Sequence, residues 1–248
     1  MNDNDFDKAI AKLQRMIDES RSIVFFGGAG VSTESGIPDF RSTDGLYHQQ
    51  WNYPPEQMLS RSFFDANPAE FYRFYREKLI VKGVKPNAAH KKLAELEKAG
   101  KLTAVVTQNI DGLHQAAGSQ NVCELHGSIA RWPCTVCGTI YPTAYVLQEE
   151  QKPIPYCEAC GGLVRPGVVL YGEGLDPDVL EKSVRAIRDA DTLIVGGTSL
   201  VVYPAAGLID YFQGRHLVLI NQTKTHADAS ADLVIRSPIG QVLKEAVA

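Results

Sequence analysis

The chain has 248 residues, with 25 Lys and Arg against 29 Asp and Glu, so its formal net charge is −4. Hydrophobic residues make up 44% and charged residues 22%, which is close to the globular average and excludes disordered, collagen-like and coiled-coil classes. The acidic balance argues against general nucleic-acid binding, which needs a basic surface. This length predicts one large domain, or one domain carrying a smaller insert.

Apolar residues at helical spacing from Phe6 to Ile17 predict an opening amphipathic helix. Short apolar runs then predict buried strands at 22–26, 102–107, 122–124, 192–195, 216–220 and 232–235. Helical patterns separate these runs, notably at 88–99 and 178–190. Strands that alternate with helices predict an α/β fold, in which helices cover both faces of a mostly parallel sheet.

The polar, acidic N-terminus does not resemble a secretory signal. Residues 192–209 carry no charge and approach the length of a membrane span, but Gly196, Gly197 and Pro204 interrupt them. We therefore expect this stretch to be protein core, with no membrane contact.

Two segments break the alternation. Residues 39–80 are rich in aromatic side chains and prolines, which fits either a helical insert with its own small core or a lid that faces a substrate. Residues 127–170 contain four of the five cysteines and several Pro and Gly, and they predict a small metal-stapled module.

The four cysteines form two C-x-x-C pairs, Cys134 with Cys137 and Cys157 with Cys160. Four thiolates at this spacing favour a tetrahedral Zn²⁺ site that has no open position and is therefore structural. Disulfides or free thiols are the alternative. This use of cysteine suggests the cytosol. One Lys against three Glu between Cys134 and Cys160 argues against a ribbon that binds nucleic acid.

Gly28 and Gly30 follow the first predicted strand, where their backbone N–H groups can approach a pyrophosphate. The usual dinucleotide fingerprint has a further Gly where this chain has Thr33, and no acidic strand end follows at the usual distance. A simple hydride-transferring dehydrogenase is therefore a poor fit.

Polar residues also follow other predicted strands, and each of them alone could be a turn or a helix cap. Because the carboxyl ends of parallel strands meet at one edge, these residues together predict a single crevice. Of the six histidines, His126 at a strand end is the best-placed general base, whereas His90 and His114 fit core or capping positions.

Several motifs resemble the sirtuins, the NAD-dependent protein lysine deacylases. They are Gly28-Ala-Gly-Val-Ser-Thr-Glu-Ser-Gly-Ile-Pro-Asp-Phe-Arg41, Pro86-Asn-x-x-His90, Thr107-Gln-Asn-Ile-Asp111, Leu125-His-Gly127, the cysteine pairs, Val168-Val-Leu-Tyr-Gly-Glu173 and Gly197-Thr-Ser-Leu-Val-Val-Tyr-Pro-Ala-Ala206. They cover nearly the whole chain in order. The resemblance implies a Rossmann-like large domain (1–38, 81–126 and 171–248), a cofactor-binding loop and helical module (39–80) and a zinc ribbon (127–170).

The resemblance also implies roles for individual residues. His126 is implied as the general base, and Asn109 and Asp111 as further catalytic residues. The implied NAD⁺ contacts are Gly28, Ala29, Gly30, Thr33, Ile37, Phe40, Arg41, Gln108, Asn109, Ile110, Asp111, Gly197, Thr198, Ser199, Asn221, Gln222 and Ile239. The implied substrate contacts are Val168, Val169, Tyr171, Gly172, Glu173, Leu200, Val201, Val202 and Tyr75.

The activity implied by the resemblance converts an acetyl-lysine protein and NAD⁺ to free lysine, nicotinamide and O-acetyl-ADP-ribose. Tyr75 and Lys78 stand where desuccinylating relatives have a Tyr and an Arg, and a Lys offers no bidentate fork to a carboxylate, so we expect deacetylation. Mono-ADP-ribosyl transfer and a non-catalytic zinc-ribbon interaction module are the alternatives. We further expect a cytoplasmic monomer that acts on acyl-lysine proteins and does not bind nucleic acid directly.

Overall fold

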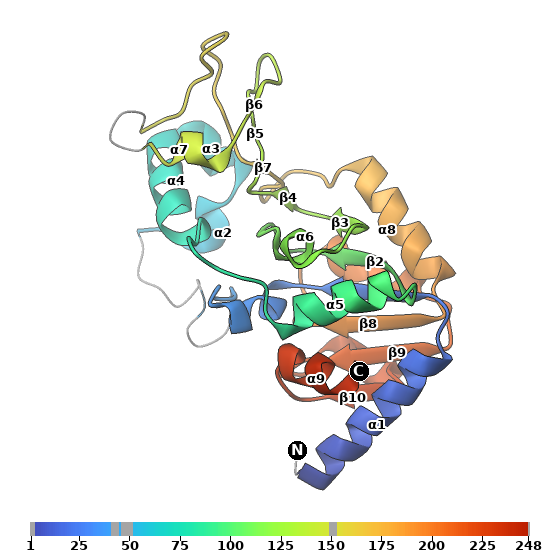
Figure 1. Cartoon of the computed structure of the whole chain (residues 1–248). Helices are drawn as coiled ribbons and strands as arrows, with labels where there is room; N and C mark the ends of the chain where they lie inside the picture. The colour runs from blue at the N-terminus through green and yellow to red at the C-terminus, as the bar shows by residue number, and fades with distance from the viewer. Residues whose placement is uncertain (1–2, 41–44, 46–51, 149–152, 248) are drawn as a thin grey trace.

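The computed structural model describes residues 3–40, 45, 52–148 and 153–247 (Figure 1). Its centre is a six-stranded sheet in the order β10-β9-β8-β1-β2-β3, and every pairing in this sheet is parallel. The strands are β1 (Ile23–Gly27), β2 (Leu102–Thr107), β3 (Val122–Glu124), β8 (Thr192–Gly196), β9 (His216–Ile220) and β10 (Leu233–Ile235). The predicted strands and their parallel arrangement are confirmed.

Helices cover both faces of this sheet. One face packs against α1 (Asp3–Glu19), α5 (Ala88–Lys98) and α9 (Ile239–Ala246) through a cluster that includes Ile23 and Phe25. The other face packs against α8 (Pro177–Asp189) and a 3₁₀ helix (Ala205–Tyr211) through Val24 and Phe26. Because successive side chains of a strand point to opposite faces, β1 is buried along its whole length.

The chain order of the strands creates a switch point between β1 and β8. After β1 the chain builds β2 and β3 on one side, and only later builds β8, β9 and β10 on the other side. Loops that leave adjacent strands here diverge, which leaves a crevice at the carboxyl end of the sheet. The fold therefore places a ligand-binding crevice next to the predicted glycine loop.

Asn87, which precedes α5, holds the glycine loop after β1 in place. Asn87 accepts hydrogen bonds from the Ala89 and His90 N–H groups, which caps α5, and its amide donates to the Val31 carbonyl at 2.7 Å. His90 and His114, which lies in α6 (Leu113–Ala117), are buried, as predicted for core and capping histidines.

The helical insert and the metal module share one hydrophobic core. The insert contains α2 (Pro55–Met58), α3 (Arg61–Ala66), α4 (Pro68–Phe74) and a π-helical turn (Tyr75–Leu79). The metal module contains α7 (Thr143–Val146) and two small antiparallel pairs, β4 (Gly127–Ser128) with β7 (Gly167–Val168) and β5 (Trp132–Pro133) with β6 (Ile140–Tyr141).

That shared core joins Phe64, Phe71 and Tyr72 of the insert to Trp132 and Val164 of the metal module. Arg76 is buried and donates to the carbonyls of Val146 and Pro153, which also links the two. They therefore form one small body beside the large sheet (Figure 1). The domain boundaries named above stay a prediction. No helix among the described residues is long and apolar enough to cross a membrane.

Candidate functional site

A cavity of about 630 Å³ lies at the carboxyl ends of the central strands and extends to the small body. Most of the predicted site residues line it. They are Gly28, Ala29, Gly30, Thr33, Ile37, Phe40, Gln108, Asn109, Ile110, Asp111, His126, Gly197, Thr198, Ser199, Asn221, Gln222, Ile239, Val168, Val169, Tyr171, Gly172, Glu173, Val202 and Tyr75. The expectation that the strand-end residues share one crevice is confirmed.

Two glycine loops meet at the switch point. The Gly30 N–H donates to the Gly197 carbonyl at 2.8 Å, and a Cβ on Gly30 would lie only 2.9 Å from the Gly197 backbone. Gly197 itself has φ of 60°, and a Cβ there would lie 2.4 Å from the Val31 nitrogen. Glycine is therefore required at these positions so that the loops after β1 and β8 can touch. The sequence alone explained the glycines only by the approach of a ligand.

Hydrogen bonds connect the strand ends to one another. Gln108, after β2, donates to the Thr198 hydroxyl at 3.0 Å. Asn221, after β9, donates to the Thr198 carbonyl at 2.8 Å. The loop after β8 is thus held from both sides, and the floor of the cavity is fixed before any ligand enters.

A polar triad lies beside the first glycine loop. Ser32 donates to an Asp111 carboxylate oxygen at 2.6 Å and accepts from the Asn109 amide at 3.1 Å. The second Asp111 oxygen accepts from the Leu113 N–H at 2.9 Å. These bonds fix the orientation of the Asp111 carboxylate. Sequence reasoning gave Ser32 no role, although its place inside the longest motif was a signal for one.

His126 is held in a single tautomer. Its Nδ1 lies 2.9 Å from the Gln108 carbonyl, which can only accept, so Nδ1 carries the proton and Nε2 keeps its lone pair. Nε2 makes no hydrogen bond within the described part of the chain. Burial lowers the pKa of His126 below its usual value, against the opposing effect of the Gln108 carbonyl. His126 therefore lies at the cavity wall as an imidazole that favours its neutral form.

The two segments predicted to contact a substrate differ in position. The Val168–Glu173 segment lines the cavity, where the Val169 N–H donates to the His126 carbonyl at 2.9 Å. Of the second segment, Val202 lines the cavity, whereas Leu200 is buried at φ 55° and Val201 is half exposed outside it. Substrate contacts by Leu200 and Val201 stay predictions. Tyr203, the last residue of that predicted segment, lines the cavity, and so does Pro204, to which the sequence assigned no contact.

The end of the cavity next to the helical insert is mainly apolar. Leu59, Leu79, Val81, Val84 and Ile129 line it. The insert therefore faces the cavity, and its core is the one it shares with the metal module, not a separate core as one of the two expectations had it. Tyr75 is fully buried there, and its hydroxyl has no partner among the described residues. Lys78 also lines this end and lies 3.3 Å from Glu77.

The four paired cysteines converge as predicted. Their Sγ atoms all lie within 4.8 Å of one another, at 3.5 Å for Cys134 and Cys160 and 3.6 Å for Cys137 and Cys157, and none forms a disulfide. A zinc tetrahedron with Zn–S of about 2.3 Å has S–S edges of about 3.8 Å, so the set fits Zn²⁺.

Both cysteine pairs turn in the same way. The Gly138 N–H donates to the Cys134 carbonyl and the Gly161 N–H to the Cys157 carbonyl, and both glycines have φ near 74°. Four thiolates leave no open coordination position, so this is a structural site. Arg41, predicted to lie over the nicotinamide, is outside the described residues.

These features together define a Rossmann-like α/β fold with a four-cysteine site suited to structural zinc and a histidine of fixed tautomer in the cavity. The model of the Sir2 family matches residues 28–204, and the chain belongs to this family. The chain is 60% identical over 240 residues to the NAD-dependent protein deacetylase of Clostridium acetobutylicum, which covers 96% of this chain and 98% of that protein.

The NAD-dependent protein deacetylase of Clostridium perfringens is 58% identical and covers 97% of this chain and 99% of its own length. Among solved structures, a Sir2 bound to acetylated peptide superposes with a TM-score of 0.86 at 38% identity, covering 95% of each chain. A Sir2 with a deacetylated peptide and 3′-O-acetyl ADP ribose gives a TM-score of 0.89 at 38% identity and covers 95% of this chain and 96% of that one.

Proposed function

We propose that this chain is an NAD-dependent protein lysine deacetylase in which His126 is the general base. The observation that carries the proposal is the single tautomer of His126, which leaves Nε2 unprotonated in a residue that lines the same cavity as the glycine loops and the Val168–Glu173 segment. The names of the relatives and the peptide complexes of the structural neighbours agree with it.

The residues of the cavity fit NAD⁺ and an acetyl-lysine. When bound, NAD⁺ supplies an electrophilic ribose carbon that takes the acetyl oxygen and releases nicotinamide. The N–H groups of Gly28 and Gly30 already donate to the Gly196 and Gly197 carbonyls, so these glycines serve a pyrophosphate by leaving room at the cavity wall and not by donating to it. Asp111, held by Ser32, is oriented to accept from the carboxamide. Ile37, Phe40 and Ile110 supply apolar walls that exclude water. His126 then takes a proton from a ribose hydroxyl.

Acetyl selectivity follows from the apolar end of the cavity. The Lys78 ammonium already has Glu77 beside it, and a Lys cannot bind a carboxylate in the bidentate way of an Arg. We therefore expect faster deacetylation than desuccinylation. Comparable rates on matched acetyl- and succinyl-lysine peptides would contradict this.

Mass spectrometry of an acetyl-lysine peptide with and without NAD⁺ tests the activity. We expect deacetylation with matching nicotinamide and O-acetyl-ADP-ribose, and only with NAD⁺. ADP-ribose attached to protein instead would favour mono-ADP-ribosyl transfer, and no NAD⁺ consumption by folded, zinc-loaded protein would favour a non-catalytic ribbon.

The variant His126→Ala tests the base. It should fold and keep zinc, but lose turnover at least about 100-fold, which is the usual contribution of a general base. Turnover within a few-fold of the unmodified chain would contradict the assignment.

We also propose a cytoplasmic monomer that does not bind nucleic acid directly. The paired cysteines are placed as free thiols suited to a metal, which suits a reducing compartment, and the net charge of −4 opposes phosphate. Light scattering, cell fractionation and a gel-shift assay check these three points.

A further inference from the structure

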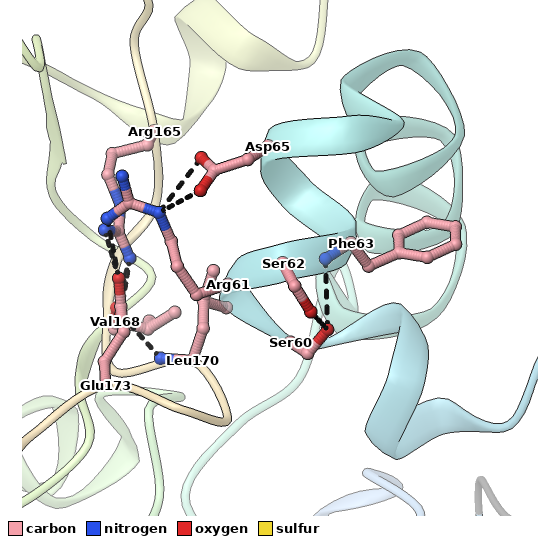
Figure 2. A network of polar contacts seen from close by, with 9 residues as sticks. All are labelled: Ser60, Arg61, Ser62, Phe63, Asp65, Arg165, Val168, Leu170 and Glu173. Atoms are coloured by element: carbon pink, nitrogen blue, oxygen red, sulfur yellow. Dashed lines mark hydrogen bonds and ion pairs between the residues drawn. The ribbon is translucent and has the colours of Figure 1, made fainter.

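Glu173 has no acceptor site left for a substrate. One carboxylate oxygen accepts from Arg165 Nη1 at 2.6 Å and from Arg61 Nη1 at 3.2 Å. The other accepts from Arg165 Nη2 and from the Leu170 N–H, both at 2.8 Å. A carboxylate offers about four such sites, and its own chain occupies all of them. These contacts are drawn in Figure 2. Glu173 therefore has no oxygen site left to bind the peptide, although it lines the cavity.

Arg165 completes the arrangement. Its guanidinium forms a two-pronged pair with Glu173 and also donates to the Val168 carbonyl at 3.0 Å. The Cζ atom of its guanidinium lies over the Phe64 ring of the helical insert, 5.7 Å from the ring centre. The two side chains thus link the two ends of the Arg165–Glu173 segment. They also bind its backbone at the Val168 carbonyl and the Leu170 N–H.

Arg61 extends the arrangement to the helical insert. It lies at the start of α3, where its side chain also pairs with Asp65. The backbone N–H of Arg61 donates to the Tyr171 carbonyl at 2.9 Å. The Tyr171 N–H in turn donates to the Leu59 carbonyl at 3.0 Å. The segment is therefore anchored to the insert on one side and to the His126 carbonyl, through Val169, on the other.

We propose that Glu173, with Arg165 and Arg61, is a positioning residue that sets the Val168–Glu173 segment for an acyl-lysine peptide without touching that peptide. The proposal rests on the proposed deacetylase function and deepens it. A peptide that adds as a strand gains its affinity from backbone hydrogen bonds, so the edge it pairs with must be held at fixed register. We call the three side chains of Glu173, Arg165 and Arg61 the clamp. The clamp should set the affinity for the peptide and leave the reacting groups unchanged.

The charge state of the clamp supports this role. Burial by itself would raise the pKa of Glu173, but the hydrogen bonds from Arg165 and from the Leu170 N–H outweigh it and lower the pKa to about 2. The facing groups are the guanidinium ions of Arg165 and Arg61 and, beyond Arg61, the Asp65 carboxylate. Glu173 therefore stays charged wherever the enzyme is folded and active.

The test is Glu173→Gln, which keeps the size of the side chain but turns two acceptor sites into donors that face arginine. We expect the KM for an acetyl-lysine peptide to rise about tenfold, as for the loss of a partly buried, hydrogen-bonded charge, while kcat and the KM for NAD⁺ stay within about twofold. Hydrogen exchange of the Leu170 and Tyr171 amides should become faster. Glu181→Gln, which removes an exposed ion pair with Arg185 on α8, is the matched control and should change neither readout.

Arg61→Met is a milder variant that protects the test against misfolding, because this side chain is half exposed. It should raise the peptide KM about threefold and leave kcat unchanged. An unchanged peptide KM with unchanged amide exchange in both variants would overturn the proposal, and so would a fall in kcat at constant KM. If the unmodified chain lacks turnover, the proposed deacetylase function is wrong. Hydrogen exchange of the Leu170 and Tyr171 amides, and binding of the same peptide measured by fluorescence anisotropy, still test the role of Glu173 in that case.

Discussion

At the scale of single residues, the position of backbone groups determines the state of the site side chains as much as the residue types do. The tautomer of His126, on which its proposed role as a base depends, is selected by one backbone carbonyl, that of Gln108. Ser32 matters because it has one hydroxyl that both donates to Asp111 and accepts from Asn109. Neither relation is visible in residue types alone, because both depend on which strand ends lie side by side.

The pH dependence of the reaction should follow His126. Since burial lowers the pKa of His126, the neutral base predominates above pH 6.5, and activity should fall only at lower pH. A kcat/KM profile for the peptide between pH 5 and 8 checks this. An acid limb with its midpoint above pH 7 would contradict the assigned environment.

Gly30→Ala should disrupt the contact between the two glycine loops. The new Cβ would lie 2.9 Å from the Gly197 backbone, which cannot yield as a flexible side chain can. Overpacking of this kind costs about 1–3 kcal/mol, so we expect the NAD⁺ affinity to fall about tenfold or more. Isothermal titration with NAD⁺ measures this loss. Gly174→Ala is the control, because a Cβ there meets nothing within 4 Å, and equal affinities of the two variants would refute the argument.

At the scale of elements, the sequence predicts the large sheet well and the small body only in part. Parallel strands that are buried on both faces are nearly continuous apolar runs, so β1 and β8, which are fully buried, and β2 and β9, which are largely buried, can be predicted from the sequence. The spacing of the cysteine pairs likewise predicts their convergence. The shared core of insert and ribbon was not predictable, because it joins Tyr72 to Val164 and Arg76 to Val146 across long stretches of sequence.

That shared core predicts the effect of metal removal. Cys134 and Cys157 are buried in the same cluster as Phe71, Tyr72 and Trp132, so loss of zinc should loosen the helical insert as well as the ribbon. Cys157→Ser should lose zinc and reduce deacetylation at least about tenfold, while the helix signal of the sheet domain persists. Zinc content, turnover and circular dichroism measure this, with Cys123→Ser as the zinc-retaining control. Full activity without zinc would contradict it.

At the scale of the whole molecule, buried histidines couple stability to pH. His90 and His114 lie with ring centres 4.8 Å apart and are buried. Burial lowers the pKa of His90 to about 4, against the attraction of Asp111, and burial together with His90 lowers the pKa of His114 to about 3. The unfolded chain therefore binds more protons than the folded chain below pH 6.5, and stability must fall as the pH falls through that range.

His114→Leu should weaken this pH dependence. Neither ring nitrogen of His114 has a partner among the described residues, so an apolar side chain of similar volume loses no hydrogen bond there. At pH 7 we expect the free energy of unfolding to change by less than about 1 kcal/mol. At pH 4.5 the unmodified chain should have lost about 2–3 kcal/mol through this one group, and the variant should keep that stability. Urea unfolding at pH 7, 5.5 and 4.5 measures the difference, with the exposed His226→Gln as control. Parallel losses in His114→Leu and the unmodified chain would show that His114 does not govern acid stability.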